Sequence, residues 1–451
     1  MTGPMKILLA AGASMLALTG AAAADNEGSA SEVDRLAARL AELEAMVASL
    51  RTELDAARSD GEAAEDRIVR LEQRDPPPPV TAAASPDGNG FMAGNTRVRY
   101  GGFIDVDAHV TDLSDGDIAP TSIARDFYIP GATPVGGTGE SEPDTDFTAQ
   151  GSRFFFATET PTDLGPVTSR IEFDFLGSPG GDERVSNSYN PRMRVAWAQL
   201  GGWRAGQDWS TFQNTAAIPE SASFLIASDG MVFVRQAQIR YTAGNFQFAL
   251  ENGDTTVTPF GGGARIDAGD GALPDLVARY NIAGEGRNIA LAAIARRLSA
   301  ETGGIDGEAF GWGLSVQGRQ ALGESTEVRF SLTGGEGVGR YLGLNAINGA
   351  VATATGELEP IPVIGGLIAL RQEIGDGRRI NLGLSALTAD NDTTLTGMSA
   401  TRQVRSAFGA LMIPVGPGVT LGAELMVGER ELESGASGTI TRATLSTKYA
   451  F

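Results

Sequence analysis

The sequence predicts an all-β fold, a 16-stranded antiparallel transmembrane β-barrel, with an N-terminal α-helical coiled coil in front of it. Three observations lead to this prediction. Apolar residues recur every 3.5 positions in residues 31–75 and mostly at every second position within the strands expected in residues 97–451. No segment contains the roughly 18 to 20 apolar residues that a membrane-spanning helix needs. The links between the expected strands alternate between short and long.

Residues 1–24 have the pattern of a secretory signal peptide. Lys6 precedes an apolar run from Ile7 to Leu18, and Ala22-Ala23-Ala24 forms a small-residue cleavage site. A charged start, a short apolar stretch and an A-x-A site are typical of exported proteins. We therefore expect the mature protein to begin at Asp25.

Residues 31–75 are expected to form a periplasmic coiled coil. Apolar or small residues follow one another at alternating steps of three and four, at Val33, Leu36, Leu40, Leu43, Val47, Leu50, Leu54, Ala57, Gly61, Ala64, Ile68 and Leu71. This period is the seam of a left-handed coiled coil, although a single amphipathic helix lying on a larger domain has a similar stripe. Pro76 to Pro79 end the helix, and residues 76–96 form a linker rich in Pro, Ala and Gly.

The barrel is expected over residues 97–451. In the third strand, Val167, Ile171 and Phe173 alternate with Thr168, Arg170 and Glu172, as expected when one face meets lipid and the other a wet lumen. The strands are expected near 97-110, 150-159, 167-175, 192-200, 203-210, 234-243, 246-251, 274-282, 288-298, 308-321, 324-334, 361-371, 378-386, 403-413, 419-430 and 439-451.

The links between these strands indicate the topology. Seven are short, such as Gly201-Gly202 and Gly244-Asn245, and the other eight are mostly longer and rich in Gly, Asp, Asn and Thr. An even number of strands with tight turns on one side is typical of the Gram-negative outer membrane, with the termini and the coil in the periplasm. An exported β-sandwich is the alternative, but it would show no such alternation of link lengths.

Composition excludes several functions. The chain has no Cys and one His, so thiol chemistry is excluded and a Ser-His-Asp triad would need His109, which we expect at a strand end near the surface. A net charge of -21 argues against a nucleic-acid partner, because phosphate backbones are bound by basic surfaces. Among the 35 basic residues only Lys6 and Lys448 are lysines. This arginine bias suits anion handling, and high-GC codon usage also produces it.

Several segments together resemble the DcaP-like porins, a family of trimeric outer-membrane channels. They are Gly102-Phe103-Ile104-Asp105, Asp126-Phe127-Tyr128-Ile129-Pro130-Gly131, Gly206-Gln207-Asp208-Trp209-Ser210-Thr211-Phe212, Arg235-Gln236-Ala237-Gln238-Ile239-Arg240-Tyr241-Thr242 and Lys448-Tyr449-Ala450-Phe451. The resemblance covers nearly the whole chain. It implies a sixteen-stranded barrel, a homotrimer, an arginine-lined constriction and a preference for negatively charged solutes such as dicarboxylates.

The non-apolar parity of each strand predicts which arginines face the lumen. They are Arg99, Arg153, Arg170, Arg192, Arg194, Arg240, Arg279, Arg329, Arg405 and Arg442. Lipid rejects charges in any barrel, which explains the inward facing but not the clustering on the second to sixth strands. Arg235 has the other parity at a strand start, so we set it aside.

The third long loop, 213–233, is the one that general porins fold inward. If it does so here, Glu220 and Asp229 would face Arg170, Arg192, Arg194 and Arg240 across a charged constriction. We therefore expect the solute-binding residues to be Arg153, Arg170, Arg192, Arg194, Arg240, Arg279, Glu220 and Asp229.

Carboxylate pairs offer other chemistry. Asp105/Asp107 and Glu172/Asp174 each share a strand face, which suits counter-charges for arginine and also a hydrolase or an oxygen-ligated metal. The acidic loop from Asp112 to Asp146 suits either solvated acidity or divalent cations.

The sequence as a whole favours a passive outer-membrane porin for small anionic solutes, without enzymatic activity or a cofactor. Its other expected partners are outer-membrane lipid, lipopolysaccharide and two further copies of the chain. A structural alternative stays open, in which the coil reaches peptidoglycan and the barrel is only an anchor. An outer-membrane enzyme that uses a luminal carboxylate pair is a third hypothesis, which the missing nucleophile-base pair disfavours.

Overall fold

The computed structural model describes residues 90–137, 142–177, 186–269, 271 and 273–451. The expected signal peptide and coiled coil, and most of the expected linker, lie outside the described residues.

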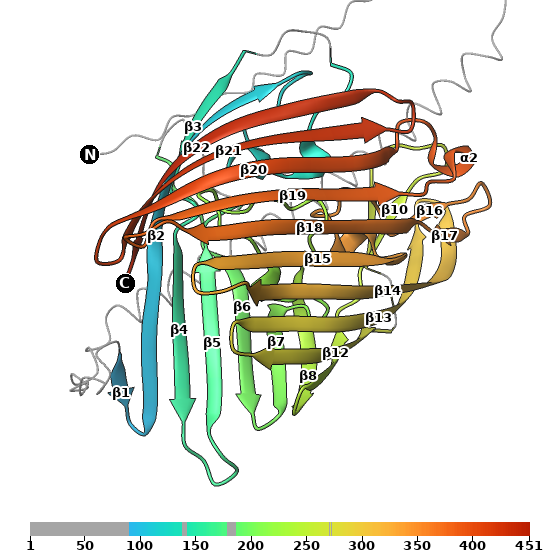
Figure 1. Ribbon diagram of the computed structural model, residues 1–451. Helices are drawn as coiled ribbons and strands as arrows, with labels where there is room; N and C mark the ends of the chain where they lie inside the picture. Colours follow the sequence, from blue (N-terminus) through green and yellow to red (C-terminus); the bar gives the residue numbers. More distant parts are fainter. Residues whose placement is uncertain (1–89, 138–141, 178–185, 270, 272) are drawn as a thin grey trace, which may run out of the picture. The chain divides into compact units, whose positions relative to one another are not determined.

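Within the described residues, all sixteen expected strands are present and form one closed antiparallel barrel. The first and last strands close it, because β2 pairs with β22 from Phe103↔Ala450 to Leu113↔Ile440. The strands β12 to β15 and β18 to β22 lie side by side as a continuous curved wall (Figure 1). The barrel strands are β2 (Thr96–Leu113), β4 (Arg153–Thr160), β5 (Val167–Asp174), β6 (Arg192–Leu200), β7 (Trp203–Trp209), β8 (Arg235–Ala243), β9 (Phe246–Glu251), β12 (Asp275–Gly284), β13 (Arg287–Thr302), β14 (Ile305–Ala321), β15 (Thr326–Glu336), β18 (Pro362–Glu373), β19 (Arg379–Ala389), β20 (Thr401–Gly416), β21 (Val419–Leu432) and β22 (Ser437–Ala450).

The two faces of the barrel differ as a membrane demands. Along β22, Arg442, Thr444 and Ser446 are buried on the inner face, whereas Leu445 between them is 65% exposed on the outer face. In lipid every backbone polar group must be paired within the protein, and a closed sheet achieves this without leaving an edge. The inner face then holds the polar side chains that lipid would reject.

Two expectations about the faces are wrong. Arg405 points outward, where it pairs with Glu429, because the apolar side chains Phe408 and Ala410 of the same strand face inward. They pack against Tyr128 and Ile226 from loops inside the barrel. His109 is not near the surface: it is fully buried on the inner wall, with its Nδ1 2.9 Å from Thr444 Oγ1.

The long loops contain small elements that the sequence did not predict. β1 (Phe91–Ala93) and β3 (Asp144–Thr148) pair with β2, and a separate four-stranded sheet contains β11 (Ile266–Ala268), β10 (Thr255–Thr258), β16 (Ala350–Ala352) and β17 (Leu358–Pro360). The described helices are η1 (Ile123–Arg125), η2 (Pro130–Ala132), η3 (Thr215–Ala217), η4 (Gly339–Tyr341) and α2 (Thr393–Thr396). None of these helices has the length or the apolar composition to cross a bilayer.

The loop between β7 and β8, residues 210–234, lies inside the barrel, and we call it the inner loop. It contacts inward-facing side chains of strand after strand, the inward course that the sequence left open for the third long loop. Its hydrogen bonds join Asn214 to Gln317 of β14, Ile218 to Arg329 of β15, Glu220 to Arg379 of β19, Ser223 to Glu424 of β21 and Gly230 to Ser385 of β19. The inner loop therefore crosses the lumen to the opposite wall.

The inner loop also belongs to an apolar core within the barrel. Phe212 and Val232, at its two ends, are fully buried against Tyr341 and Leu342 of the loop that follows β15. The rings of Phe212 and Tyr341 are 5.8 Å apart in an edge-on arrangement. Apolar burial thus fixes the loops inside the barrel in addition to their hydrogen bonds.

Gly230 lets the inner loop touch the wall. A Cβ atom there would lie 2.2 Å from the backbone N and O of Gly366 and 2.5 Å from the backbone O of Ala386. Overpacking of this kind costs about 1–3 kcal/mol, whereas one hydrogen bond contributes about 1 kcal/mol. We expect Gly230→Ala to detach this part of the loop and to raise the single-channel conductance in planar bilayers.

Gly284→Ala is the matched control, because a Cβ at Gly284 would meet nothing within 4 Å. It should conduct like the unmodified protein. An unchanged conductance in Gly230→Ala would mean that the inner loop does not narrow the pore.

Candidate functional site

Four arginines and two carboxylates from three neighbouring strands form one ion-paired cluster on the inner wall, which we call the arginine ladder. The strand register brings them together, since Asp174 of β5 lies opposite Arg192 of β6. Its members are Arg153 of β4, Arg170, Glu172 and Asp174 of β5, and Arg192 and Arg194 of β6.

Arg194 lies at the centre of the arginine ladder. A β-bulge leaves it as the extra residue between Met193 and Val195, opposite the Glu172–Phe173 step. Bulges re-aim side chains in this way. Its guanidinium, 2% exposed, binds Glu172 Oε1 at 2.9 Å and Asp174 Oδ2 at 2.6 Å. The bulge thus lets one arginine hold both carboxylates.

The arginines on either side of Arg194 in the arginine ladder are more exposed to the lumen. Arg170 binds Glu172 at 2.8 Å with 31% of its side chain exposed, and Arg192 binds Asp174 at 2.8 Å with 27% exposed. Arg153 Nε is 3.6 Å from Glu172 and has no hydrogen-bond partner in the described part of the chain. With four arginines and two carboxylates, the arginine ladder carries an excess of positive charge.

Arg235 joins this cluster, although strand parity had led us to set it aside. It is the first residue of β8, opposite Trp209, and its guanidinium lies 5.1 Å from the centre of that ring. Its charged neighbours include Arg194 and Arg192. Arg235 Nη1 is buried, and among the described residues it has no hydrogen-bond partner. Parity fails here because a side chain at a strand end can bend across its partner strand.

Aromatic rings support the arginines. Arg170 lies 3.8 Å from the ring centre of Phe155, and Arg194 lies 5.7 Å from that of Trp209 and 5.4 Å from that of Phe224. Cation–π contacts hold a guanidinium by its face and leave its N–H edge available. Phe224 is the inner loop's contribution to this wall.

Two of the expected site arginines lie on the inner face but hold the inner loop rather than the arginine ladder. Arg240 is 3.5 Å from Asp208 of β7, and its Nε donates to Oγ1 of Thr211 in the inner loop at 2.9 Å. Arg279 donates to the backbone O of Gln213 at 2.7 Å. Both therefore secure the start of the inner loop.

Glu220 does not face the arginine ladder as expected. The inner loop carries it across the lumen to the far wall, where it binds Arg371 at 3.3 Å and Arg379 at 2.9 Å. Burial opposes ionisation of Glu220, but the hydrogen bond and charge of Arg379 prevail and lower its pKa below the ordinary value.

Asp229 is fully buried away from the arginine ladder. Tyr128 Oη donates to its Oδ1 at 2.8 Å, and Ser406 Oγ bonds its Oδ2. Burial raises the pKa of Asp229 from 3.8 to about 6, against the opposing effect of the Ser406 and Tyr128 hydrogen bonds. Both acids were expected to complete the charged constriction, and the loop's full crossing of the lumen removes them from it.

The carboxylate pairs have basic neighbours. Asp105 lies 3.2 Å from Lys448, and Glu172 and Asp174 are held by the arginine ladder, as counter-charges would be. Within the described residues, no three acidic, His or Cys side chains come together as a metal site.

Residues 82–451 match the DcaP outer membrane protein family. The structure is similar to that of the outer membrane channel DcaP of Acinetobacter baumannii, with a TM-score of 0.65 and 20% identity over 80% of this chain and 100% of that one. Weaker similarity extends to OmpT of Vibrio cholerae, with a TM-score of 0.48 and 10% identity over 80% and 100% of the two chains. An anion-selective porin from Comamonas acidovorans has a TM-score of 0.47 and 12% identity over 79% and 100%. No curated protein matches the sequence.

Asp229 makes the anchoring of the inner loop dependent on pH. Because its folded pKa of about 6 exceeds the ordinary 3.8, its contribution to stability is complete below pH 3.8 and is lost as the pH rises through about 6. The change amounts to roughly 2–3 kcal/mol. We expect Asp229→Asn to flatten the dependence of thermal stability on pH between 4 and 7, measured as the unfolding midpoint in detergent.

Asp392→Asn changes an exposed loop carboxylate and should leave that dependence as it is. An Asp229→Asn protein with the unmodified pH profile would show that Asp229 does not titrate in this range.

Proposed function

The chain belongs to the DcaP outer membrane protein family, and on this premise we propose that it is a passive channel for small anionic solutes, dicarboxylates among them. Its fold is that of an outer-membrane porin, which locates it in the Gram-negative outer membrane. The arginine ladder and Phe224 of the inner loop together form one wall of the proposed constriction.

The observation that carries the proposal is the unmatched positive charge of this wall. Arg153 and Arg235 each have a buried N–H group without an acceptor among the described residues, and two carboxylates serve the four arginines of the ladder. A buried donor without an acceptor costs about 1–3 kcal/mol. The uncompensated positive charge of these arginines would attract a solute carboxylate in the lumen, whereas a cation would be repelled.

The positive charge at the constriction, rather than the net charge of -21 of the whole chain, decides which ions pass. Charges are screened over roughly 8 Å at physiological salt, so acidic groups at the mouth have little effect inside the pore. Arginine donates through a planar fork that matches a carboxylate. A dicarboxylate can engage two separate arginines, such as Arg170 and Arg235, and gains more than a monocarboxylate.

The proposal includes the assembly that the sequence led us to expect. The barrel associates as a homotrimer and contacts outer-membrane lipid and lipopolysaccharide. The mature protein begins at Asp25 after removal of its signal peptide. The coiled coil of residues 31–75 lies in the periplasm, within reach of peptidoglycan. The support for these features is the heptad pattern and the cleavage-site pattern of the sequence.

Replacing Arg153 and Arg235 together by Ser should make the channel less selective for anions. A positive charge about 8 Å from an ion contributes on the order of 2 kcal/mol at an effective dielectric constant of about 20. Because about 1.4 kcal/mol corresponds to a factor of ten, the ratio of anion to cation permeability should fall by at least roughly tenfold. The measurement is the reversal potential of the channel in a planar bilayer under a salt gradient.

Arg405→Ser, on the outer face, is the control and should leave the reversal potential unchanged. Cation selectivity of the unmodified channel would refute the proposed function. A protein that inserts but does not conduct would favour the structural alternative, in which the barrel is only an anchor.

Deleting residues 25–75 should leave a conducting oligomer, because the small seam residues Ala57, Gly61 and Ala64 weaken the second half of the coil. Cross-linking in detergent measures whether the shortened protein is still an oligomer, and planar-bilayer recording measures whether it still conducts. A monomeric product would place all of the association energy in the coil.

A further inference from the structure

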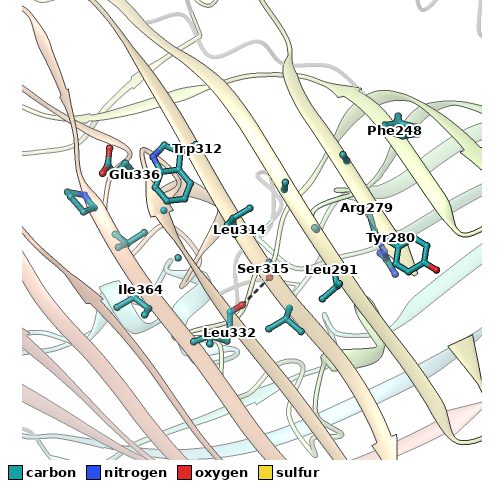
Figure 2. Close-up of a pocket in the computed structure, with 18 of the residues that line it drawn as sticks. Phe248, Arg279, Tyr280, Leu291, Trp312, Leu314, Ser315, Leu332, Glu336 and Ile364 are labelled. Carbon is teal, nitrogen blue, oxygen red and sulfur yellow. Dashed lines mark hydrogen bonds between the residues drawn. The ribbon is translucent and has the colours of Figure 1, made fainter. Parts of the chain in front are cut away.

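The outer face of the barrel strands from β7 to β18 contains three adjoining depressions that the anion pathway does not use. Their volumes are ≈ 480, ≈ 600 and ≈ 930 Å³. The first two share Leu276 and Ala295, and the second and third share Phe248 and Ala293. Together they form one continuous hollow, which we call the outer furrow, and Figure 2 shows its largest part.

The strand register explains the outer furrow. Ala295 of β13 lies between Leu276 of β12 and Trp312 of β14, and Ala293, two residues away on the same face, lies opposite Leu314. Two small side chains on the middle strand thus form a floor between large side chains on its neighbours. In Figure 2, Trp312, Leu314 and Tyr280 are among the side chains around this floor.

The outer furrow is charged at the end toward the inner loop's side of the barrel, where β13 runs on from Ala295 to Thr302, and long loops on that side are extracellular in outer-membrane barrels. Arg297 and Glu308 form an ion pair there, with 42% and 55% of their side chains exposed, and both line the same depression as Phe310. Arg297 lies two residues beyond Ala295 on the outer face. A lipid-facing charge costs about 2–4 kcal/mol at the bilayer midplane and little at the interface, so this pair marks the level of the lipid headgroups.

The same combination recurs on the outer face of β19 to β21. A depression of ≈ 470 Å³ has Leu384, Ala407 and Leu425 among its lining residues. The pair Arg405–Glu429, at 2.7 Å, lies two residues from Ala407 toward the extracellular side. An apolar hollow capped by an exposed arginine therefore occurs twice on this outer face.

We propose that the outer furrow binds one phosphorylated, multiply acylated lipid of the outer leaflet, with its acyl chains along β13 and its phosphate at Arg297. Charge complementarity favours this occupant, because the apolar hollow ends at an exposed guanidinium. Three connected depressions also offer more room than the two chains of an ordinary phospholipid fill. The phosphate replaces Glu308 as the partner of Arg297, and Glu308 accepts a hydrogen bond from a headgroup hydroxyl.

The test measures lipid retained by the full-length protein in mild detergent, by native mass spectrometry. The delipidated protein is titrated with lipid A, with the same lipid after removal of its phosphates, and with phosphatidylethanolamine. The unmodified protein should retain one lipid A per chain at this site and bind the dephosphorylated form roughly tenfold more weakly, equivalent to about 1.4 kcal/mol.

Two variants separate the phosphate contact from the acyl contact. Arg297→Gln should weaken lipid A by roughly tenfold but leave the dephosphorylated lipid unaffected. The double variant Ala293→Leu and Ala295→Leu fills the outer furrow and should weaken both lipids. Arg265→Gln is the control, since Arg265 is also an exposed arginine paired with an acid, Asp267, but lies on a loop.

Three results would overturn the proposal: retention of lipid A by either furrow variant as in the unmodified protein, retention of phosphatidylethanolamine in preference to lipid A, or contact between copies at this face. The last is tested with Phe310→Cys, which introduces the chain's only thiol. A disulfide between two Cys-containing copies in native membranes would make the face a subunit contact. None of these readouts depends on which ions the pore conducts, so the proposed function can fail while this one stands.

Discussion

The pairing of backbone polar groups within a bilayer is the constraint from which the rest of this structure follows. Lipid offers no hydrogen bonds, so the sheet closes on itself where β2 meets β22. Closure divides every strand into an outer and an inner face, and the inner face collects the charged side chains. The arginine ladder is possible because closure brings β4, β5 and β6 into a fixed register with their polar parity inward.

Inside this wall, the balance of charge and packing decides which arginines remain available. Arg240 and Arg279 are engaged with Asp208 and the inner loop's backbone, and Arg371 and Arg379 are engaged with Glu220. The arginine ladder differs because its arginines outnumber its carboxylates and aromatic rings support their faces. The loops thereby form hydrogen bonds or ion pairs with many of the inner arginines, and the wall that contains the arginine ladder keeps an excess of positive charge.

Strand periodicity and link length are local properties, and they were sufficient to predict all sixteen barrel strands. Most of the inward arginines followed from the same parity, including Arg170, Arg192 and Arg442. Arg405 was misplaced because parity alone cannot tell lipid from an apolar loop inside the barrel, and β20 turns its apolar residues toward such a loop.

The loops set the limit of sequence reasoning here. Glu220 and Asp229 were assigned to the wrong wall, since the path of a loop depends on contacts distant in sequence, such as Ser223 with Glu424. Arg235 was set aside because of its parity at a strand start, although Arg235 and its neighbour Trp209 both lie in segments that carry the family resemblance. The bulge at Arg194 had no sequence signal that we can identify.

The apolar core formed by Phe212, Val232 and Tyr341 fixes both ends of the inner loop, which carries Phe224 to the proposed constriction. Close-packed interiors resist gradual deformation, so such an aperture does not stretch around a larger solute. Its bore changes instead in steps of the size of a side chain, as buried residues are exchanged. Relatives that keep the barrel could therefore acquire new solute ranges through single substitutions in this core, without altering any group that the solute touches.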